Sequence, residues 1–411
     1  MSKIILVAGY TKKSYLSKIR AHYKGSNILL ACAYSRRPHS EVKTAYLSYF
    51  DVCYDLEIKA DRDRLKLDAS NVLLVTCTQE RDMIAYIDAQ LLCGKITDEQ
   101  AHNYRILIDK EYFKKSLQKI YPELVPELHV ITPELLDTLD TLTYPLVIKP
   151  TGLAGSTLVK IVSNAAELQT HYETFSETMH KFGNEIYQKQ IHVIAEAFIS
   201  GPQFSMNVYV DRAGKITFCP LVRVVTPSEL GINDTYSALQ YTSDELSSEE
   251  VEQLKNAITK IVNHFKVTCT SMHFDCVLHH GQWKFFEAGL RIGGNRQKLF
   301  ELSHGMDHFL NDLLNRTGTS IQIPHRIKTA CIVQKAAVTH GRLLSIGYQR
   351  LVDSLQKTLI TEGKIAKIGK ETGPVSTGGG TSTRHFVFGK DQAEVIAVST
   401  KLFSDITIKL C

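Results

Sequence analysis

The 411-residue sequence lacks any apolar run near the ~20 residues that a membrane-spanning helix requires. Its start, MSKIILVAGYTKK, holds only about six consecutive apolar residues, fewer than the roughly 7–15 of a secretory signal. Charge of one sign is also scarce, because 48 Lys and Arg against 43 Asp and Glu give a net charge of +5. This balance argues against a dedicated nucleic-acid or membrane surface. We therefore expect a cytoplasmic, soluble protein with neither nucleic acid nor membrane as a partner.

Several short chemical motifs are missing as well. None of the nine cysteines forms a C-x-x-C pair, which argues against a zinc knuckle or a disulfide framework, and free thiols fit a reducing compartment. The segment GYTKKS after the first apolar run has neither the G-x-G-x-x-G nor the Walker A spacing, so it indicates a plain turn. There is no G-x-S-x-G, and no cysteine has the surroundings of a catalytic nucleophile.

What is present is a globular composition, with 44% apolar and 22% charged residues, and a length that predicts two or three packed units. The first hundred residues alternate short apolar runs with helix-length polar stretches. Such runs are typical of parallel strands covered on both faces, at 3–8, 27–33 and 71–76. We expect a doubly wound α/β unit of the Rossmann-like kind over 1–95.

The pattern changes after residue 144. Strand, glycine-rich turn and strand follow one another at 144–150, 151–157 and 158–162, and Asn164 with Glu167 has the spacing of a helix-capping box. Further strands are expected at 194–199, 204–210, 273–278 and 283–288, and helices after Ser247 and over 296–315. The last 85 residues alternate glycine turns with β-like runs, which predicts a β-rich subdomain of the same core.

Two lysines are candidates for binding phosphate. Lys110 lies in ILIDKEYF, and Lys149 ends the apolar run PLVIKP, directly before the loop 151–157 with Gly155 and Ser156. Glycines let a backbone approach an anion closely. The alternative is that both lysines are surface residues and that the glycines only shape a hairpin turn.

Glu196 stands in the apolar run IAEAFIS. It faces solvent at a strand end, or it faces a cleft and accepts a hydrogen bond from an adenine amino group. In the second case the backbone near Phe198 and Ile199 would contact the edge of the ring.

The most specific stretch is HFDCVLHHGQWKFFEAGLRIGG. Two strands joined by a tight turn place Asp275 and Glu287 on neighbouring strands, and Arg291 follows before two glycines. Carboxylates in apolar strands are costly unless a cation neutralises them, and Mg²⁺ bridging phosphate oxygens would do so. The alternative is an internal salt-bridge network.

The histidines of this stretch do not predict a metal site. His273 lies in a strand and His279 and His280 lie in a turn, and no further ligand follows at a useful spacing.

In order and separation these segments resemble the ATP-grasp superfamily, in particular the carboxylate–amine ligases that include the L-amino-acid (dipeptide) ligases. The stretches that carry the resemblance lie within 105–320 and are PLVIKPTGLAGST, AEAFISGPQFS and FDCVLHHGQWKFFEAGLRIGG. The resemblance implies an α/β (α+β) ATP-grasp fold with three parts. These are the Rossmann-like domain 1–95, a small subdomain 96–200 with the glycine-rich phosphate loop, and a large subdomain 201–411 that includes the β-rich part 325–411.

The resemblance also implies ATP and Mg²⁺ as cofactors and assigns roles to residues. Phosphate and adenine contacts would come from Lys110, Lys149, Gly155, Ser156, Glu196, Phe198 and Ile199, with Gln203 at the ribose. Asp275 and Glu287 would bind Mg²⁺, and Arg291 would be the catalytic residue on the reacting carboxylate and phosphoryl group.

Three positions depart from the family pattern. Gln203 replaces a frequent Glu, and an amide can still bond a ribose hydroxyl. Gly289 replaces a frequent Asn two residues after the second metal carboxylate, so water would take one ligand place or a second ion would be held weakly. Ala197 replaces a side chain that is often polar, at a position expected to use its backbone.

The chemistry implied is activation of a carboxylate as an acyl phosphate, followed by attack of an amine, with small-molecule substrates of which one is expected to be an amino acid. The alternative is an ATP-binding protein of this fold without ligase turnover. A homodimer is left open. Weaker substrate-binding candidates, each equally accounted for by an ordinary surface role, are Arg223, Glu229, Asp234 and Arg384.

Overall fold

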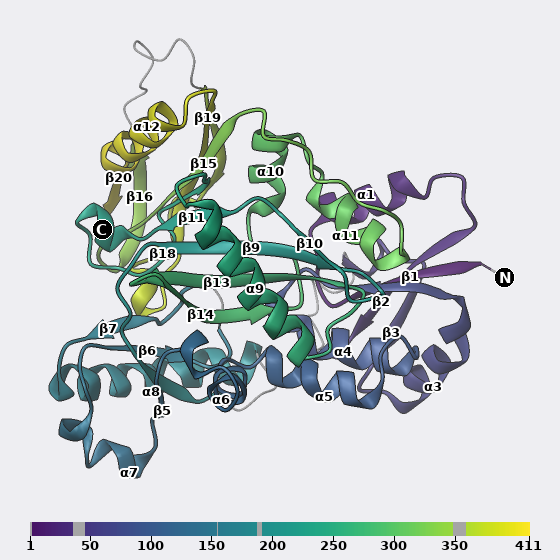
Figure 1. Cartoon of the computed structure of the whole chain (residues 1–411), viewed down its shortest axis with the longest axis horizontal. Helices are drawn as coiled ribbons and strands as arrows, with labels where there is room; N and C mark the ends of the chain where they lie inside the picture. The colour runs from purple at the N-terminus through teal and green to yellow at the C-terminus, as the bar shows by residue number, and fades with distance from the viewer. Residues whose placement is uncertain (1, 36–45, 154, 187–190, 348–358) are drawn as a thin grey trace.

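The computed structural model describes residues 2–35, 46–153, 155–186, 191–347 and 359–411. These residues form four β-sheets with helices packed around them (Figure 1). The architecture is mixed α/β, as the sequence predicts. Within these ranges no helix has the length and the apolar character that crossing a bilayer would need.

The first sheet is parallel, with strand order β3-β2-β1-β4. Its elements are β1 (Lys3–Ala8), α1 (Lys13–His22), β2 (Ile28–Tyr34), β3 (Val52–Asp55), α3 (Lys59–Asp68), β4 (Val72–Thr76) and α4 (Met83–Leu92). Alternate residues of β1 face opposite sides: Ile5 and Val7 cluster with α1, whereas Ile4, Leu6 and Ala8 cluster with α3 and α4. The predicted doubly wound unit is confirmed, with β3 as a strand that the sequence analysis did not identify.

The second sheet is antiparallel and has the order β5-β8-β6-β7. After α5 (Asp98–Leu107) and α6 (Lys110–Gln118) come β5 (Leu128–Val130), α7 (Pro133–Leu136), β6 (Leu146–Pro150), β7 (Lys160–Val162), α8 (Ala165–Ile186) and β8 (Val193–Ala197). Leu168 and Phe175 of α8 pack on Leu146 and Ile148 of β6. The predicted strand–turn–strand–helix order is therefore present.

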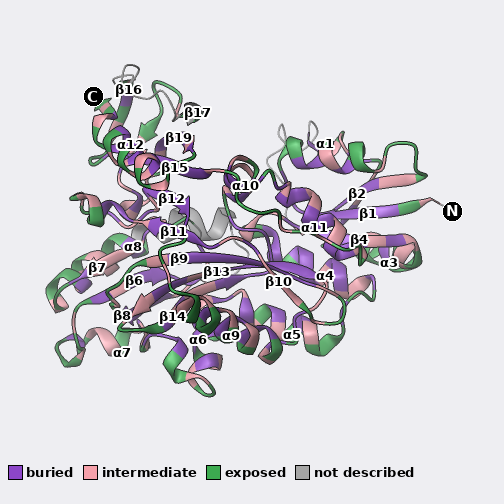
Figure 2. Cartoon of the chain, turned by 45° about the horizontal axis from the view of Figure 1, so that its top comes forward, coloured by how far each residue is buried: buried purple, intermediate pink, exposed green. Residues whose placement is uncertain are grey.

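The third sheet has nine strands and forms the centre of the molecule, where Figure 2 shows its strands largely buried. Its path is β14-β13-β9-β11-β12-β15-β19-β17, with β10 beside β9. The strands are β9 (Gln203–Val210), β10 (Ile216–Phe218), β11 (Val222–Val225), β12 (Leu239–Thr242), β13 (Thr270–His279), β14 (Gln282–Gly289), β15 (Thr329–Ala336), β17 (Leu359–Ile365) and β19 (Thr381–Gly389). The β-rich C-terminal part thus extends the same sheet.

A small fourth sheet, β18-β16-β20, lies at the C-terminal end. It consists of β16 (Gly341–Gly347), β18 (Glu371–Thr372) and β20 (Thr407–Leu410), and α12 (Gln392–Asp405) packs beside it. Helix α9 (Ser248–His264) covers the central sheet, and its predicted capping box of Ser247 and Glu250 is confirmed. At α8, Asn164 caps as predicted, but Glu167 returns to the N–H of Ser163 instead of that of Asn164.

The single helix expected over 296–315 is wrong. The segment forms α10 (Arg296–His304) and α11 (His308–Thr317), separated by a break. Gly305 ends α10 with a left-handed φ of 67°, and the Asp307 side chain caps α11 by accepting from Leu310 N. A glycine C-cap followed by an acidic N-cap redirects the chain at this point.

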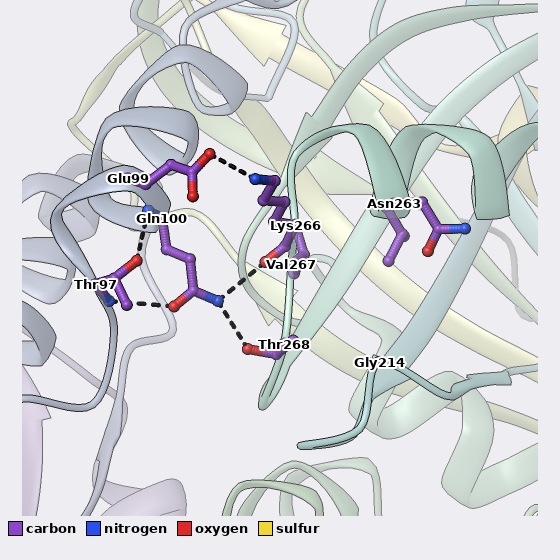
Figure 3. A pocket seen from close by; sticks show the side chains of 9 residues that line it. Thr97, Glu99, Gln100, Gly214, Asn263, Lys266, Val267 and Thr268 are labelled. Carbon is purple, nitrogen blue, oxygen red and sulfur yellow. Dashed lines mark hydrogen bonds and ion pairs between the residues drawn. The ribbon is translucent and has the colours of Figure 1, made fainter.

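Helix α5 joins the central sheet at a hollow of about 360 Å³, shown in Figure 3. Gln100 donates to the Lys266 carbonyl and to Thr268 Oγ1, both at 3.1 Å, and Glu99 pairs with the Lys266 ammonium at 2.5 Å. Glu99 and Gln100 thus bind Lys266 and Thr268 across the hollow, and this contact fastens two parts of the molecule together.

Candidate active site

Three charged side chains meet under the second sheet. Glu196 of β8 lies 2.7 Å from the Lys149 ammonium of β6 and 2.5 Å from the Lys114 ammonium of α6. Val147 pairs with Glu196 across the strands, so Lys149 stands diagonally to Glu196 on the same face. All three side chains are buried. The solvent-facing alternative for Glu196 is therefore wrong, and Lys114 is a member that the sequence analysis missed.

The electrostatics of this triad follow from two ammonium groups sharing one carboxylate. Burial lowers the pKa of Lys114 to about 7, reinforced by repulsion from Lys149 and Lys110 against the attraction of Glu196. Burial alone would raise the pKa of Glu196, but Lys114 and Lys149 together lower it. The triad thus carries a surplus of positive potential beside the glycine loop.

Lys110 connects this region to the central sheet. It begins α6, whose N-terminus is capped by the Asp109 side chain. Its ammonium donates to the Leu153 carbonyl in the glycine loop at 2.7 Å and lies 3.1 Å from Glu287 Oε2 on β14. One cation therefore touches both the loop and the acidic pair.

The acidic pair lies on the two adjacent strands as predicted. Asp275 of β13 is directly opposite Glu287 of β14, at a point where the register shifts. Burial would raise the pKa of Glu287, but the Lys110 ammonium beside it holds that pKa well below its usual value. The expectation that His273 has no further ligand nearby is wrong, because ligand atoms of His273, Asp275 and Glu287 all lie within 4.8 Å of one another.

Arg291 is held by a residue from the first part of the chain. Its Nε and Nη2 each lie 2.8 Å from Glu80 Oε2, and Nη1 donates to the Ile292 carbonyl. Burial would lower the pKa of Arg291, but Glu80, Glu287 and Asp275 raise it. Glu80 was not identified from the sequence, although it follows the carboxyl end of a parallel strand, the edge where such sheets carry ligands.

The predicted convergence is present at Lys110 of α6, which meets Glu287 of the central sheet, whereas Lys149 pairs with Glu196 of its own sheet. A small cavity at this meeting point is lined by Glu80 after the first sheet, by Leu107, Ile108, Lys110 and Phe113 of the α5–α6 region, and by Glu287 and Ala288 of the central sheet. The salt-bridge alternative for the acidic pair is partly realised, since Lys110 contacts Glu287. It does not account for the Asp275 carboxylate beside it.

The glycine loop is built from left-handed residues. Gly155 and Ser156 have φ of 72° and 59°, and a Cβ at Gly155 would meet open space. The loop is tied down on its far side, where Leu158 N donates to the Val375 carbonyl and Thr235 Oγ1 to the Val159 carbonyl. Backbone N–H groups near Gly155 thus lie in an open setting suited to an anion.

The predicted adenine segment follows Glu196 directly. Phe198 is exposed at its side chain, but its N–H donates to the Pro145 carbonyl. An adenine edge would therefore use the Phe198 carbonyl and the backbone of Ile199. Gln203 begins β9 two residues after Gly201, which must be glycine because a Cβ would lie 2.2 Å from the Leu278 carbonyl oxygen.

The weaker substrate-binding candidates are engaged in structural contacts. Arg223 pairs with Glu229 at 2.5 Å, and Glu229 also closes a capping box with Thr226. Asp234 accepts from the backbone N–H groups of Val375 and Ser376. Arg384 donates twice to the Gln334 side-chain oxygen. The surface role expected as the alternative is wrong for Arg223 and Asp234, which are buried, and their contacts favour a role within the fold.

The residues present fit the two expected groups. Ligand atoms of two adjacent carboxylates and an imidazole lie within 4.8 Å of one another, which suits a divalent cation. The ammonium groups of Lys110 and Lys149 and an open glycine loop suit a polyphosphate. Asp275, Glu287 and His273 would hold the cation, and Lys110, Lys149 and the loop would hold the phosphates.

Comparisons with known proteins agree with this geometry. A family model described as an ATP-grasp domain matches residues 142–298. No protein of curated function matches the sequence. The fold resembles an L-amino acid ligase from Bacillus licheniformis with a TM-score of 0.75 and 16% identity, covering 100% of this chain and 99% of that one.

Two further structures share the fold. N5-carboxyaminoimidazole ribonucleotide synthetase from Thermotoga maritima gives a TM-score of 0.64 and 14% identity, with 100% of both chains covered. Biotin carboxylase from Campylobacter jejuni gives 0.61 and 14%, covering 100% of this chain and 92% of that one. The chain has the ATP-grasp fold and carries an ATP-grasp domain over residues 142–298.

Proposed function

We propose that the protein is an ATP- and Mg²⁺-dependent ligase that joins a small-molecule carboxylate to an amine, with an amino acid as one substrate. The observation that carries the proposal is the contact of Lys110 with both the glycine loop and Glu287. This contact brings the loop proposed to bind phosphate and the carboxylate proposed to bind the metal to one place. The likeness to an L-amino acid ligase supports the choice of an amino acid.

The reaction would proceed in two steps, with ATP consumed as a substrate. The substrate carboxylate attacks the γ-phosphorus, forming an acyl phosphate and releasing ADP. The amine then attacks the acyl carbon, and phosphate and a proton leave. Mg²⁺ at Asp275 and Glu287 would neutralise phosphate oxygens.

The chain's own residues would overcome the repulsion between two anions. Lys110 and Lys149 place positive charge at the phosphates, and Arg291, oriented by Glu80, would face the reacting carboxylate and phosphoryl group. The loop with Gly155 and Ser156 would cover the phosphates and keep water from the acyl phosphate. Glu196, Phe198 and Ile199 would receive the adenine, and Gln203 the ribose.

We extend the proposal to the division of the chain into 1–95, 96–200 and 201–411, with 325–411 as the β-rich part, which the sheet order supports. We also propose the cytoplasm as its location. The nine cysteines are all free, which fits a reducing compartment.

A phosphate-release assay tests the proposal. ATP and Mg²⁺ are supplied with amino acids singly and in pairs, and with bicarbonate in a separate arm, because one structural neighbour is a biotin carboxylase. We expect release that depends on a carboxylate and an amine together, with a matching amide product by mass spectrometry. Release with bicarbonate alone would favour a carboxylase, and no release would favour an ATP-binding protein without turnover.

Glu287→Ala tests the metal assignment. We expect loss of Mg²⁺-dependent turnover by at least ~10³-fold, because a bound metal supplies several kcal/mol of charge stabilisation. Glu301→Ala, at an exposed residue of α10 that pairs with Lys298, is the matched control and should leave turnover unchanged. Unchanged turnover in Glu287→Ala would reject the assignment.

A further inference from the structure

An imidazole stands beside the acidic pair. His273 and Asp275 are two residues apart on β13, so their side chains share one face, and Glu287 lies across from Asp275 on β14. The ring of His273 is buried, and its Nε2 lies 3.7 Å from Glu287 Oε1. This distance is too long for a hydrogen bond, yet the three groups lie within 4.8 Å of one another.

The contact made by Nδ1 of His273 decides which ring nitrogen carries the proton. Nδ1 of His273 lies 3.3 Å from the Arg291 carbonyl oxygen. A carbonyl only accepts, so this contact places the proton on Nδ1. Nε2 is then left with a lone pair on the side of the two carboxylates. A backbone carbonyl on one ring nitrogen is the usual support of a histidine whose other nitrogen binds a metal.

Gly289 leaves the space that this ring occupies. Gly289 pairs with His273 across the two strands. A Cβ at residue 289 would lie 2.2 Å from Cε1 and 2.8 Å from Nδ1 of His273, so any larger residue there would displace the imidazole. Glycine at residue 289 therefore leaves the room in which the ring of His273 lies beside the acidic pair.

We propose that His273 is the third protein ligand of the cation site and supplies a nitrogen where an oxygen ligand is absent. The inference rests on the proposed function in using the same acidic pair. Because imidazole favours first-row transition ions over Mg²⁺, the site takes a divalent ion such as Mn²⁺ more tightly than Mg²⁺. The two cations around the acidic pair already have partners, because Lys110 contacts Glu287 and Arg291 contacts Glu80. They leave Nε2 of His273 facing the site.

Mn²⁺ itself is the probe. Electron paramagnetic resonance of the full chain, free of any histidine tag, is titrated with Mn²⁺ in the presence of ADP, and pulsed measurements detect ¹⁴N coupling to the ion. We expect one site with imidazole nitrogen coupling, and competition by Mg²⁺ only at about tenfold or higher concentration, in line with the affinity order of divalent ions. Absence of ¹⁴N coupling in the bound wild-type site would overturn the inference without any variant.

Two variants and a control sharpen the test. His273→Ala should lose the ¹⁴N coupling and weaken Mn²⁺ binding by about tenfold or more, as losses around metal sites do. His273→Ala with Gly289→Asn should recover Mg²⁺ binding without nitrogen coupling. His279→Ala, at an exposed histidine at the end of the same strand, should keep both the affinity and the coupling. Undiminished Mn²⁺ binding in His273→Ala would count against the inference.

This failure is distinguishable from failure of the ligase proposal. Metal binding is measured without turnover. Nitrogen coupling in a protein that makes no amide would therefore support His273 as a metal ligand and reject the ligase proposal. Amide formation with Mg²⁺ and no nitrogen coupling does the reverse.

Discussion

Two buried charged regions of this molecule behave differently. In the first, Asp312 of α11 is closed in by partners: one carboxylate oxygen accepts from Ser271 and Arg316, the other from Tyr15 and Thr76. In the second, Lys110 and His273 lie beside the carboxylate of Glu287, which neighbours that of Asp275. The side chain of Glu287 is 26% exposed. Both oxygens of the Asp312 carboxylate are bound by protein groups, whereas in the second region ligand atoms of His273, Asp275 and Glu287 lie within 4.8 Å of one another.

The difference separates charges that hold the fold from charges that we propose to bind a ligand. The Asp312 region joins the first sheet to the central sheet, because Arg316 also donates to the Val75 carbonyl and to Tyr86. Both oxygens of Asp312 are satisfied, which favours one arrangement of the parts, although Nη2 of Arg316 has no hydrogen-bond partner among the described residues. The Glu287 region joins the same parts of the molecule through Glu80 and Arg291, but it leaves capacity for a cation and an anion.

The largest expected effect is on stability. Asp312→Ala leaves Arg316 buried without its carboxylate, and we expect a loss of about 3–5 kcal/mol in the free energy of unfolding. Urea unfolding followed by circular dichroism measures it. Asp140→Ala, at an exposed aspartate, should change the free energy by less than about 0.5 kcal/mol. A loss in Asp312→Ala as small as that of the control would remove the contrast between the two regions.

The next effect is on activity alone. Arg291→Lys removes the fork on Glu80, and we expect turnover to fall by about 100-fold with little change in the free energy of unfolding. Arg326→Lys, at an exposed arginine that pairs with Asp244, is the control and should retain activity. Equal losses of stability in Arg291→Lys and Asp312→Ala would show that both regions serve the fold.

A third prediction concerns pH. The pKa of Lys114 is about 7 in the folded protein against 10.5 ordinarily, so between these values the unfolded chain binds more protons. Stability from this group therefore rises with pH across that window, by at most about 1.4 kcal/mol per pH unit.

Lys114→Met should remove this contribution, so the unfolding free energy of the wild type minus that of the variant should rise as pH goes from 7 to 9. Lys119→Met, at an exposed lysine that ends the same helix, should show a constant difference. A constant difference for Lys114→Met would mean that Lys114 remains protonated throughout.

The smallest effect is expected at Glu80. Glu80→Gln keeps the shape but weakens the hold on Arg291, and we expect about a tenfold fall in kcat, typical of a residue that orients another, with KM for ATP unchanged. Glu252→Gln, at an exposed partner of Lys255, is the control. A rise in KM without a change in kcat would place Glu80 in nucleotide binding instead.

Local sequence patterns predicted many of the helices and strands. The apolar runs of β1, β2 and β4, the capping box at Ser247 and the paired strands β13 and β14 were all predicted correctly. The strand β3, only VCYD, is too short and mixed to stand out, and the break at Gly305 interrupts a pattern that is periodic on both sides. Chain direction at such points depends on packing against other elements, which a local pattern does not contain.

The sequence by itself determined the residue types and their order: two lysines before a glycine loop, then an acidic pair, then an arginine. Tertiary structure alone decided which of them touch. It brought Lys114 and Lys149 to one carboxylate, Glu80 to Arg291 and His273 to Asp275 and Glu287. These contacts cross up to 211 residues of chain, and their geometry follows from sheet register and helix packing rather than from spacing along the sequence.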